Sequence, residues 1–260
     1  MWEIVAIRYG QATLPRSVLF HHYGAYDEPD APQDMAYYVY VLRSDERTLL
    51  VDTGFRPETV ARRPGRSGIV ELPDALARLG IDARSIDEII VTHFHWDHTG
   101  NLHRFPGAGL VVPEAEAAFW STPVARHAPF WSHVESDDVE LLLSAQREGR
   151  ARTTGADETV APGIRAITVG GHSPGQQVLV VDTARGPVVL TSDAVHLYEE
   201  LELGRPFGIV VDLREMYAAY ELVRGLEADG ALVVPGHDPE VTRRFPSVGG
   251  DAGSFAFRIA

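Results

Sequence analysis

Cysteine is absent from the 260-residue chain. Its absence excludes disulfide bonds, cysteine nucleophiles and metal sites built on thiolates. Any metal site in this chain must therefore use nitrogen and oxygen ligands.

Positive charge is scarce. Lys and Arg together number 23 against 37 Asp and Glu, which gives a formal net charge of −14 at pH 7. A chain this acidic repels phosphate backbones and anionic lipid surfaces. We therefore expect neither nucleic acid nor a membrane as a partner.

Long apolar runs are missing as well. No run approaches the roughly 18 residues that indicate a transmembrane helix, and residues 1–20 lack the basic and apolar regions of a secretory signal. These absences predict a cytoplasmic protein. A hydrophobic content of 45% is typical of globular chains, and we expect a single domain over residues 1–260. The sequence leaves a monomer and a homodimer open.

Strand-like and helix-like segments are both present. Stretches rich in Val, Ile and Leu recur between Gly, Pro or Asp residues, which is typical of strands. They lie at residues 3–10, 36–44, 47–54, 87–93, 108–115, 163–172, 176–184, 186–194 and 230–238. Helical patterns occupy residues 72–80, 137–149 and 212–230. This mixture predicts a layered α/β or α+β fold.

In five of the strand-like stretches the run of apolar residues finishes in a metal-ligating residue type. These residues are Asp52, His93, His172, Asp193 and His237. Strand ends are rigid, and side chains at one edge of a sheet can converge on a cleft. The pattern predicts a site assembled from distant parts of the chain.

The segment "VTHFHWDHTG", residues 91–100, concentrates the same residue types. In an extended turn His93 and His95 can face one point, while Asp97 and His98 can face a second point nearby. This arrangement suits two adjacent metal ions. Nitrogen and oxygen ligands favour Zn²⁺, and Mn²⁺, Fe²⁺ or Co²⁺ would also fit.

The series "THFHWDH", "GGHSPGQQ", "SDAVHLY" and "PGHDPE" resembles the metallo-β-lactamase superfamily, and within it the N-acyl-homoserine lactonase branch. The resemblance covers residues 52–238. It implies an α+β fold, a four-layer αβ/βα sandwich with the metals at one edge. It also implies that one metal is held by His93, His95 and His172, that the other is held by Asp97, His98 and His237, and that Asp193 bridges them. Asp52 would lie outside the ligand set and fix a ligand or its loop.

One position departs from the lactonase pattern. That branch usually has a tyrosine three residues after the bridging aspartate, where its hydroxyl polarises the substrate carbonyl. Here the position holds His196, and Tyr198 follows two residues later. Either side chain could donate the hydrogen bond, so an acyl-homoserine lactone substrate does not follow from the resemblance.

The segment 114–135 is rich in aromatic residues and histidines without a clean period. It predicts a loop or short helices over a cleft, with a satellite hydrophobic cluster as the alternative. His127 and His133 within it are candidate pocket residues, whereas His21, His22 and His103 are expected at the surface or in packing. Arg205 is either a substrate anchor or a solvated surface residue.

These features predict a dinuclear metal hydrolase that opens a small cyclic ester through a metal-bridging hydroxide. Its catalytic residues would be Asp97 and Asp193, which hold the nucleophile and move a proton, with His196 or Tyr198 as the donor to the oxyanion. The expected substrate is a small molecule with an apolar part.

Four alternatives stay open. They are a thioester or cyclic amide hydrolase of the same superfamily, a β-lactam hydrolase, an oxidoreductase with one iron that is similar to persulfide dioxygenases, and a non-catalytic binding protein on the same scaffold.

Overall fold

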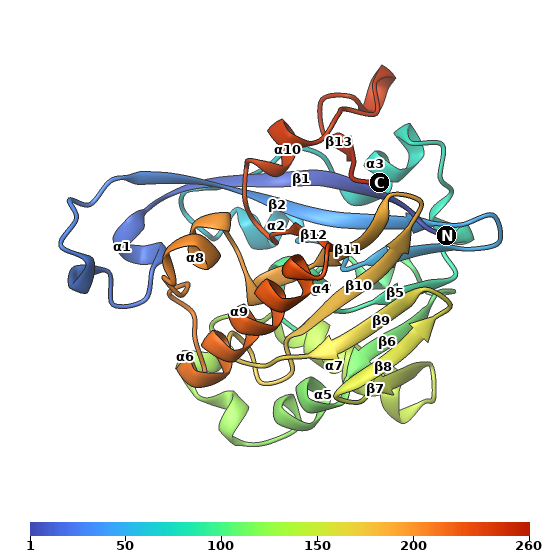
Figure 1. Ribbon diagram of the computed structural model, residues 1–260. Helices are drawn as coiled ribbons and strands as arrows, with labels where there is room; N and C mark the ends of the chain where they lie inside the picture. The colour runs from blue at the N-terminus through green and yellow to red at the C-terminus, as the bar shows by residue number, and fades with distance from the viewer.

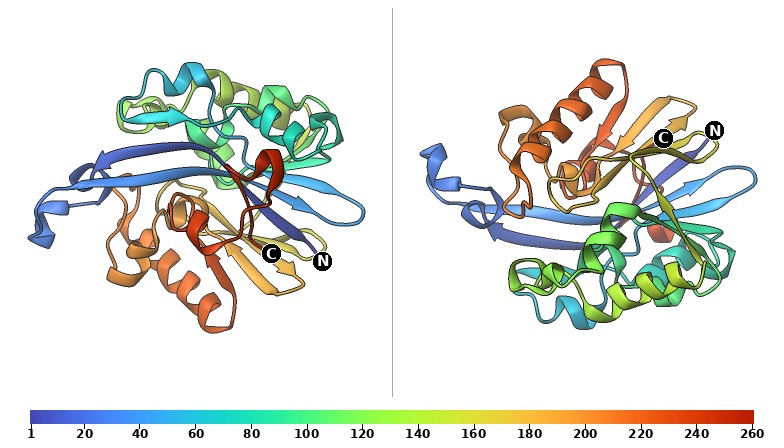
Figure 2. Two further views of the ribbon diagram at one scale, coloured as in Figure 1. Left: turned by 90° about the horizontal axis from the view of Figure 1, so that it is seen from above. Right: turned by 90° about the horizontal axis from the view of Figure 1, so that it is seen from below.

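A computed structural model describes residues 1–260 as two β-sheets packed face to face, with helices covering both outer faces (Figures 1 and 2). This is the four-layer αβ/βα arrangement that the sequence resemblance implied. None of the helices is both long and apolar enough to cross a membrane.

The larger sheet has eight strands in the order β13-β1-β2-β3-β5-β6-β7, with β4 paired to β1. In chain order they are β1 (Glu3–Pro15), β2 (Pro32–Arg43), β3 (Thr48–Val51), β4 (Arg66–Gly68), β5 (Glu88–Ile90), β6 (Gly109–Pro113), β7 (Ala151–Thr154) and β13 (Ala256–Arg258). Strands β1 and β2 pair over nearly their whole length and extend beyond the sandwich as a long hairpin (Figure 1).

The smaller sheet has five strands in the order β12-β11-β10-β9-β8. They are β8 (Asp157–Ala161), β9 (Ile164–Thr168), β10 (Gln177–Thr183), β11 (Gly186–Leu190) and β12 (Leu232–Val234). Strand β10 is antiparallel to both β9 and β11, and β12 is parallel to β11. Strands β9, β11 and β12 therefore end at the same edge of the sheet.

Side chains that alternate along the strands build two cores. In β2, Tyr38, Tyr40 and Leu42 lie in the core between the sheets, whereas Val39 and Val41 lie in the core under the helices. This period of two is the pattern of a strand buried on both faces. A smaller cluster lies beneath α9 (Leu213–Ala228) on the outer face of the second sheet.

Several helices begin where the sequence predicts. The side chain of Asp212 accepts hydrogen bonds from the backbone N–H groups of Arg214 and Glu215 and caps α9. Pro73 lies in the first turn of α3 (Leu72–Arg78). The other helices are α1 (Arg16–Leu19), α2 (Pro57–Val60), α4 (Trp96–Thr99), α5 (Glu114–Trp120), α6 (Ala128–Trp131), α7 (Ser136–Arg147), α8 (Tyr198–Leu203) and α10 (Val241–Arg244).

All nine strand-like stretches form strands, and all three helical patterns form α3, α7 and α9. The sequence did not indicate β4, β7, β8 and β13. Strand β7 has the sequence "ARTT" and β8 has "DETVA", so neither shows a run of apolar residues. Their pairing partners, β6 and β9, hold them in the sheets.

Candidate metal centre

The candidate ligand residues follow the ends of strands that pair with one another. Strands β11 and β12 are parallel, and Leu190 pairs with Val234 at their ends. Asp193 and His237 each follow three residues later, so both lie just beyond the same sheet edge. In the larger sheet the parallel strands β3 and β5 end at paired Val51 and Ile90, immediately before Asp52 and the 91–100 segment.

The predicted ligands gather in two buried groups. Within each group the nitrogen and oxygen atoms that could bind a cation lie within 4.8 Å of one another. The first group contains His93, His95, His172 and Asp193, and the second contains Asp97, His98 and His237. Segments separated by as many as 144 positions along the chain, from His93 to His237, therefore meet at one place.

Asp193 lies between the two groups and turns one carboxylate oxygen to each. Its Oδ1 lies 3.2 Å from Nε2 of His98 and 3.0 Å from Nε2 of His237. Its Oδ2 lies 3.3 Å from Nε2 of His172 and 3.9 Å from Nε2 of His93. A carboxylate in this position can contact two cations at once.

The outward-facing nitrogens of three histidines are held by acceptors of the fold. Nδ1 of His98 donates to Asp52 Oδ2 at 2.7 Å, and Nδ1 of His237 donates to the carbonyl of Ala36 at 2.9 Å. Nδ1 of His172 likewise donates to the carbonyl of Ile209 at 3.0 Å. Because Nδ1 is occupied in each ring, Nε2 is left to face the cluster, as ligand orientation requires.

The donor set fits divalent cations. Burial lowers the pKa of His93, His95 and His172 well below the ordinary value, so these imidazoles are neutral, the form that binds metal. Nε2 of His93 is buried without any hydrogen-bond partner, and unpaired polar atoms in a protein interior are costly. Nδ1 of His95 and Nε2 of His172 lie 2.9 Å apart, so both can approach one cation.

Asp193 carries negative charge within this cluster. Burial alone would raise the pKa of its carboxyl group, but the neighbouring His237, His98 and His196 outweigh burial and hold the pKa well below the ordinary value. An ionised carboxylate at the centre of the site is what a bridging ligand needs.

His196 lies against the ligand cluster. Its Nε2 is 3.1 Å from Asp193 Oδ2, and its ring stacks on Phe207 with centroids 3.6 Å apart. Burial lowers the pKa of this imidazole, but the carboxylates of Asp193 and Glu200 outweigh that effect and raise it to about 9.

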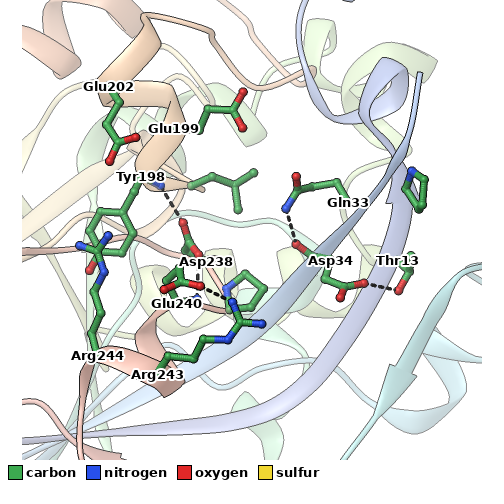
Figure 3. A pocket seen from close by; sticks show the side chains of 13 residues that line it. Thr13, Gln33, Asp34, Tyr198, Glu199, Glu202, Asp238, Glu240, Arg243 and Arg244 are labelled. Carbon is green, nitrogen blue, oxygen red and sulfur yellow. Dashed lines mark hydrogen bonds and ion pairs between the residues drawn. The ribbon is translucent and has the colours of Figure 1, made fainter. Parts of the chain in front are cut away.

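Tyr198 is not brought to the cluster. Its hydroxyl donates to the carbonyl of Val233, and Arg244 lies over its ring at 3.6 Å. It lines a polar cavity of about 550 Å³ that also holds Asp238 and Arg243 but none of the seven ligands (Figure 3). Between the two candidate donors, only His196 stands beside Asp193.

A second cavity, of about 530 Å³, opens directly on the first ligand group. His95 and His172 line it, and apolar side chains form much of its wall. The wall includes Trp120, Pro129, Phe130, Ile209, Val210 and Val211. The predicted 114–135 segment thus forms short helices, α5 and α6, at a cleft, and several of its aromatic residues also pack against the main core.

Among the remaining candidate histidines, only His133 lines this cavity, with its ring centroid 5.4 Å from that of His95. His22, His103 and His127 are exposed, and His21 is half-buried away from the cavity. Arg205 pairs with Glu28 at 2.7 Å and with Glu199 at 3.2 Å, and it lies outside this cavity.

Two buried carboxylates beside the site were not among the residues that the sequence predicted. Glu116 accepts hydrogen bonds from the backbone N–H of Phe94 and Gly175 and from Trp120 Nε1, so it joins the 91–100 segment, the 172–176 loop and α5. Glu200 lies four residues after His196 and is fully buried. Both occur in acidic helical segments that read as solvent-facing, and only the spacing from His196 could have singled out Glu200.

Comparison with known proteins agrees with this geometry. The sequence profile of the Metallo-beta-lactamase superfamily matches residues 33–237. An N-acyl homoserine lactonase of a Bacillus species is 28% identical over 225 residues, covering 81% of this chain and 84% of the relative. The N-acyl homoserine lactonase AiiA of Bacillus thuringiensis subsp. kurstaki is 28% identical and covers 77% and 80%.

Solved structures show the same fold. An N-acyl homoserine lactone hydrolase with N-hexanoyl-L-homoserine at its catalytic metal centre superposes with a TM-score of 0.76 at 21% identity, covering 93% of this chain and 95% of that one. AidC, a dizinc quorum-quenching lactonase, gives a TM-score of 0.70 at 19% identity, covering 92% and 88%. Since the matched profile spans both ligand groups within a shared αβ/βα sandwich, the chain belongs to the metallo-β-lactamase superfamily.

Proposed function

We propose that this chain is a hydrolase with two divalent cations that opens a small cyclic ester. The observation that carries the proposal is the placement of Asp193, whose two oxygens face the two ligand groups separately. One cation would be held by His93, His95, His172 and Asp193, and the other by Asp97, His98, His237 and Asp193. When bound, such a pair supplies Lewis acidity to a carbonyl oxygen and makes water nucleophilic near neutral pH.

The side chains around the site have distinct proposed roles. Water attacks the ester carbon, and the bond from that carbon to the ring oxygen breaks. Asp97 accepts the proton of the attacking water and returns it to the leaving ring oxygen, giving a hydroxy acid. The carboxylate of Asp97 lies 3.8 Å from both His98 and His237, and no hydrogen bond ties it elsewhere.

The donor to the developing negative charge is proposed to be His196. Its Nε2 lies beside Asp193 at the junction of the two ligand groups. The hydroxyl of Tyr198 is already engaged by Val233, so Tyr198 is the weaker candidate.

The cavity suggests the kind of substrate. Trp120, Phe130 and Ile209 offer an apolar wall beside His95 and His172, and this fits a lactone ring that carries an apolar substituent. N-acyl homoserine lactones are one such class, and the 21%-identical structure with N-hexanoyl-L-homoserine at its metal centre is consistent with it. Zinc is the cation that the nitrogen and oxygen donor set favours.

The test combines metal analysis with a hydrolysis screen on the same sample. We expect two divalent ions per chain and ring opening of lactones, measured over varied ring sizes and acyl chains. Asp193→Ala should lose both cation content and activity, whereas Asp182→Ala, an exposed carboxylate on β10, should retain both. One iron per chain with oxygen consumption on a persulfide would instead establish the oxidoreductase, and full activity of Asp193→Ala would refute the bridging role.

A further inference from the structure

Glu200 is a carboxylate without exposure to solvent, in the first turn of α8. Its Oε1 accepts hydrogen bonds from the backbone N–H of His196 at 3.2 Å and of Leu197 at 3.1 Å. Its Oε2 accepts the hydroxyl of Tyr220 at 2.9 Å. A buried carboxylate is costly unless it is fully paired, and these contacts place Glu200 against the turn that carries His196.

The ring of His196 is fixed from three sides. Nδ1 lies 3.4 Å from Glu200 Oε1, and Nε2 lies 3.1 Å from Asp193 Oδ2. The phenyl ring of Phe207 lies nearly parallel to the imidazole, with an angle of 11° between the planes. Both ring nitrogens are buried and neither has a hydrogen-bond partner, so these two carboxylates contact them at ion-pair distance only. The two carboxylates are therefore the charged groups that decide how the ring is turned.

We propose that Glu200 is a positioning residue that turns Nε2 of His196 toward the bridging carboxylate of Asp193. Glu200 acts at two points, because one oxygen holds the backbone of residues 196 and 197 and also faces Nδ1 of the ring. With Nδ1 facing Glu200 and the ring plane set by Phe207, Nε2 can point only into the cluster. This inference rests on the proposed function of the site, since Asp193 must serve as the shared ligand.

The proposal predicts how the variants combine. Partners that orient metal ligands typically alter cation affinity by about 10–100-fold when they are lost. Glu200→Gln keeps an oxygen for the backbone N–H groups but removes the charge, and it should weaken Zn²⁺ binding about 10-fold. His196→Phe should weaken it by a similar factor. The double variant should be no weaker than either single variant, because Glu200 acts through His196.

The experiment measures Zn²⁺ affinity by competition with a chelator in the four proteins of this double-mutant cycle. It needs no substrate, so it gives a result even if no lactone is hydrolysed and the proposed reaction fails. Tyr217→Phe, which removes an exposed hydroxyl from α9, serves as the control and should bind Zn²⁺ like the unaltered chain.

Two outcomes would overturn the proposal. One is unchanged affinity in Glu200→Gln. The other is a loss in the double variant that equals the product of the single losses, because a general disturbance of the α8 turn would act whether or not His196 is present. If Glu200→Gln does not unfold cooperatively, Glu200→Asp replaces it in the same cycle. Asp keeps the charge but withdraws it by one methylene, and the same criterion decides.

Discussion

Asp52 and His98 are 46 positions apart in the chain, yet Oδ2 of Asp52 lies 2.7 Å from Nδ1 of His98. The same carboxylate accepts the backbone N–H and the hydroxyl of Thr92, each at 2.8 Å. Asp52 thus connects the end of β3 to the 91–100 segment. It also adopts a left-handed backbone conformation with φ of 63°, which is uncommon for a residue other than glycine.

Replacing Asp52 with asparagine should weaken the second ligand group. The amide presents a donor where the carboxylate accepted, so one partner of Oδ2 is lost and the ring of His98 is no longer held. We expect cation affinity to fall about 10–100-fold, as measured by chelator competition. Asp34→Asn, an exposed carboxylate that bonds Thr13, is the control. An affinity equal to that of the unaltered chain would contradict the orienting role.

Replacing Glu116 with alanine should destabilise the fold. Four donors would lose their acceptor, namely the backbone N–H groups of Phe94 and Gly175, Trp120 Nε1 and the hydroxyl of Ser173. Each buried donor left unpaired costs about 1–3 kcal/mol, so we expect a loss of at least about 3 kcal/mol in the free energy of unfolding. Urea denaturation of the metal-free protein measures it.

Glu114→Ala is the control on the same helix, because Glu114 is exposed. Its cost should stay below about 1 kcal/mol. Equal losses in the two variants would show that Glu116 does not tie the ligand loops together.

Gly171→Ala should also be strongly destabilising. Gly171 precedes His172 and has φ of 83°, and an added Cβ would lie 2.6 Å from the backbone N and 2.7 Å from Cα of Met216 in α9. We expect a loss of more than about 2 kcal/mol, from strain and collision together. Gly225→Ala, at an exposed and open position within α9, should instead stabilise the protein by about 0.5–1 kcal/mol. Thermal unfolding distinguishes them, and the prediction fails if Gly171→Ala is neutral.

Asp138 should make stability depend on pH. Burial raises the pKa of this carboxyl group to about 7, which outweighs the opposing effect of Arg56 at 3.1 Å, while Glu135 and Asp137 add to the rise. Between about pH 4 and pH 7 the folded chain keeps a proton that the unfolded chain releases. The contribution of Asp138 to stability is therefore present at low pH and is lost as pH rises through 7.

Asp138→Asn should remove this dependence. The stability of the variant relative to the unaltered chain should increase by about 1 kcal/mol or more between pH 5 and pH 8. Chemical denaturation of both proteins in metal-free buffer at several pH values measures the difference. Glu148→Gln, an exposed position after α7, should show no such trend. Parallel pH profiles of Asp138→Asn and the unaltered chain would refute the assignment.

Phe130 should influence which lactones bind. Its side chain lines the cavity over His95 and His172, whereas Phe119, with its ring centroid 5.1 Å away, does not line it. Phe130→Ala removes apolar wall, so KM for lactones with longer acyl chains should rise several-fold while kcat changes little. Phe119→Ala is the matched control. Equal changes in KM for both variants would indicate a packing effect rather than contact with substrate.

The sequence alone was sufficient to select the residues that gather in the two candidate groups and to locate most of the elements. These features depend on local signals, each of which acts over a few residues. The signals are the alternating side chains of β2, the Asp212 cap of α9 and the apolar runs before the candidate ligands. The spacing of His93, His95, Asp97 and His98 indicated two groups because neighbouring side chains have few directions available. The sequence did not predict strands β7 and β8, because their pairing partners, rather than their own composition, hold them in the sheets.

Only the tertiary structure decided which residues surround those ligands. Whether His196 or Tyr198 stands beside Asp193 depends on how α8 packs, and two residues of separation place one inside the cluster and the other in a different cavity. Glu116 and Glu200 look like solvated helix residues until the fold buries them against donors from distant segments. Burial and long-range pairing are properties of the packed chain, so no local pattern records them.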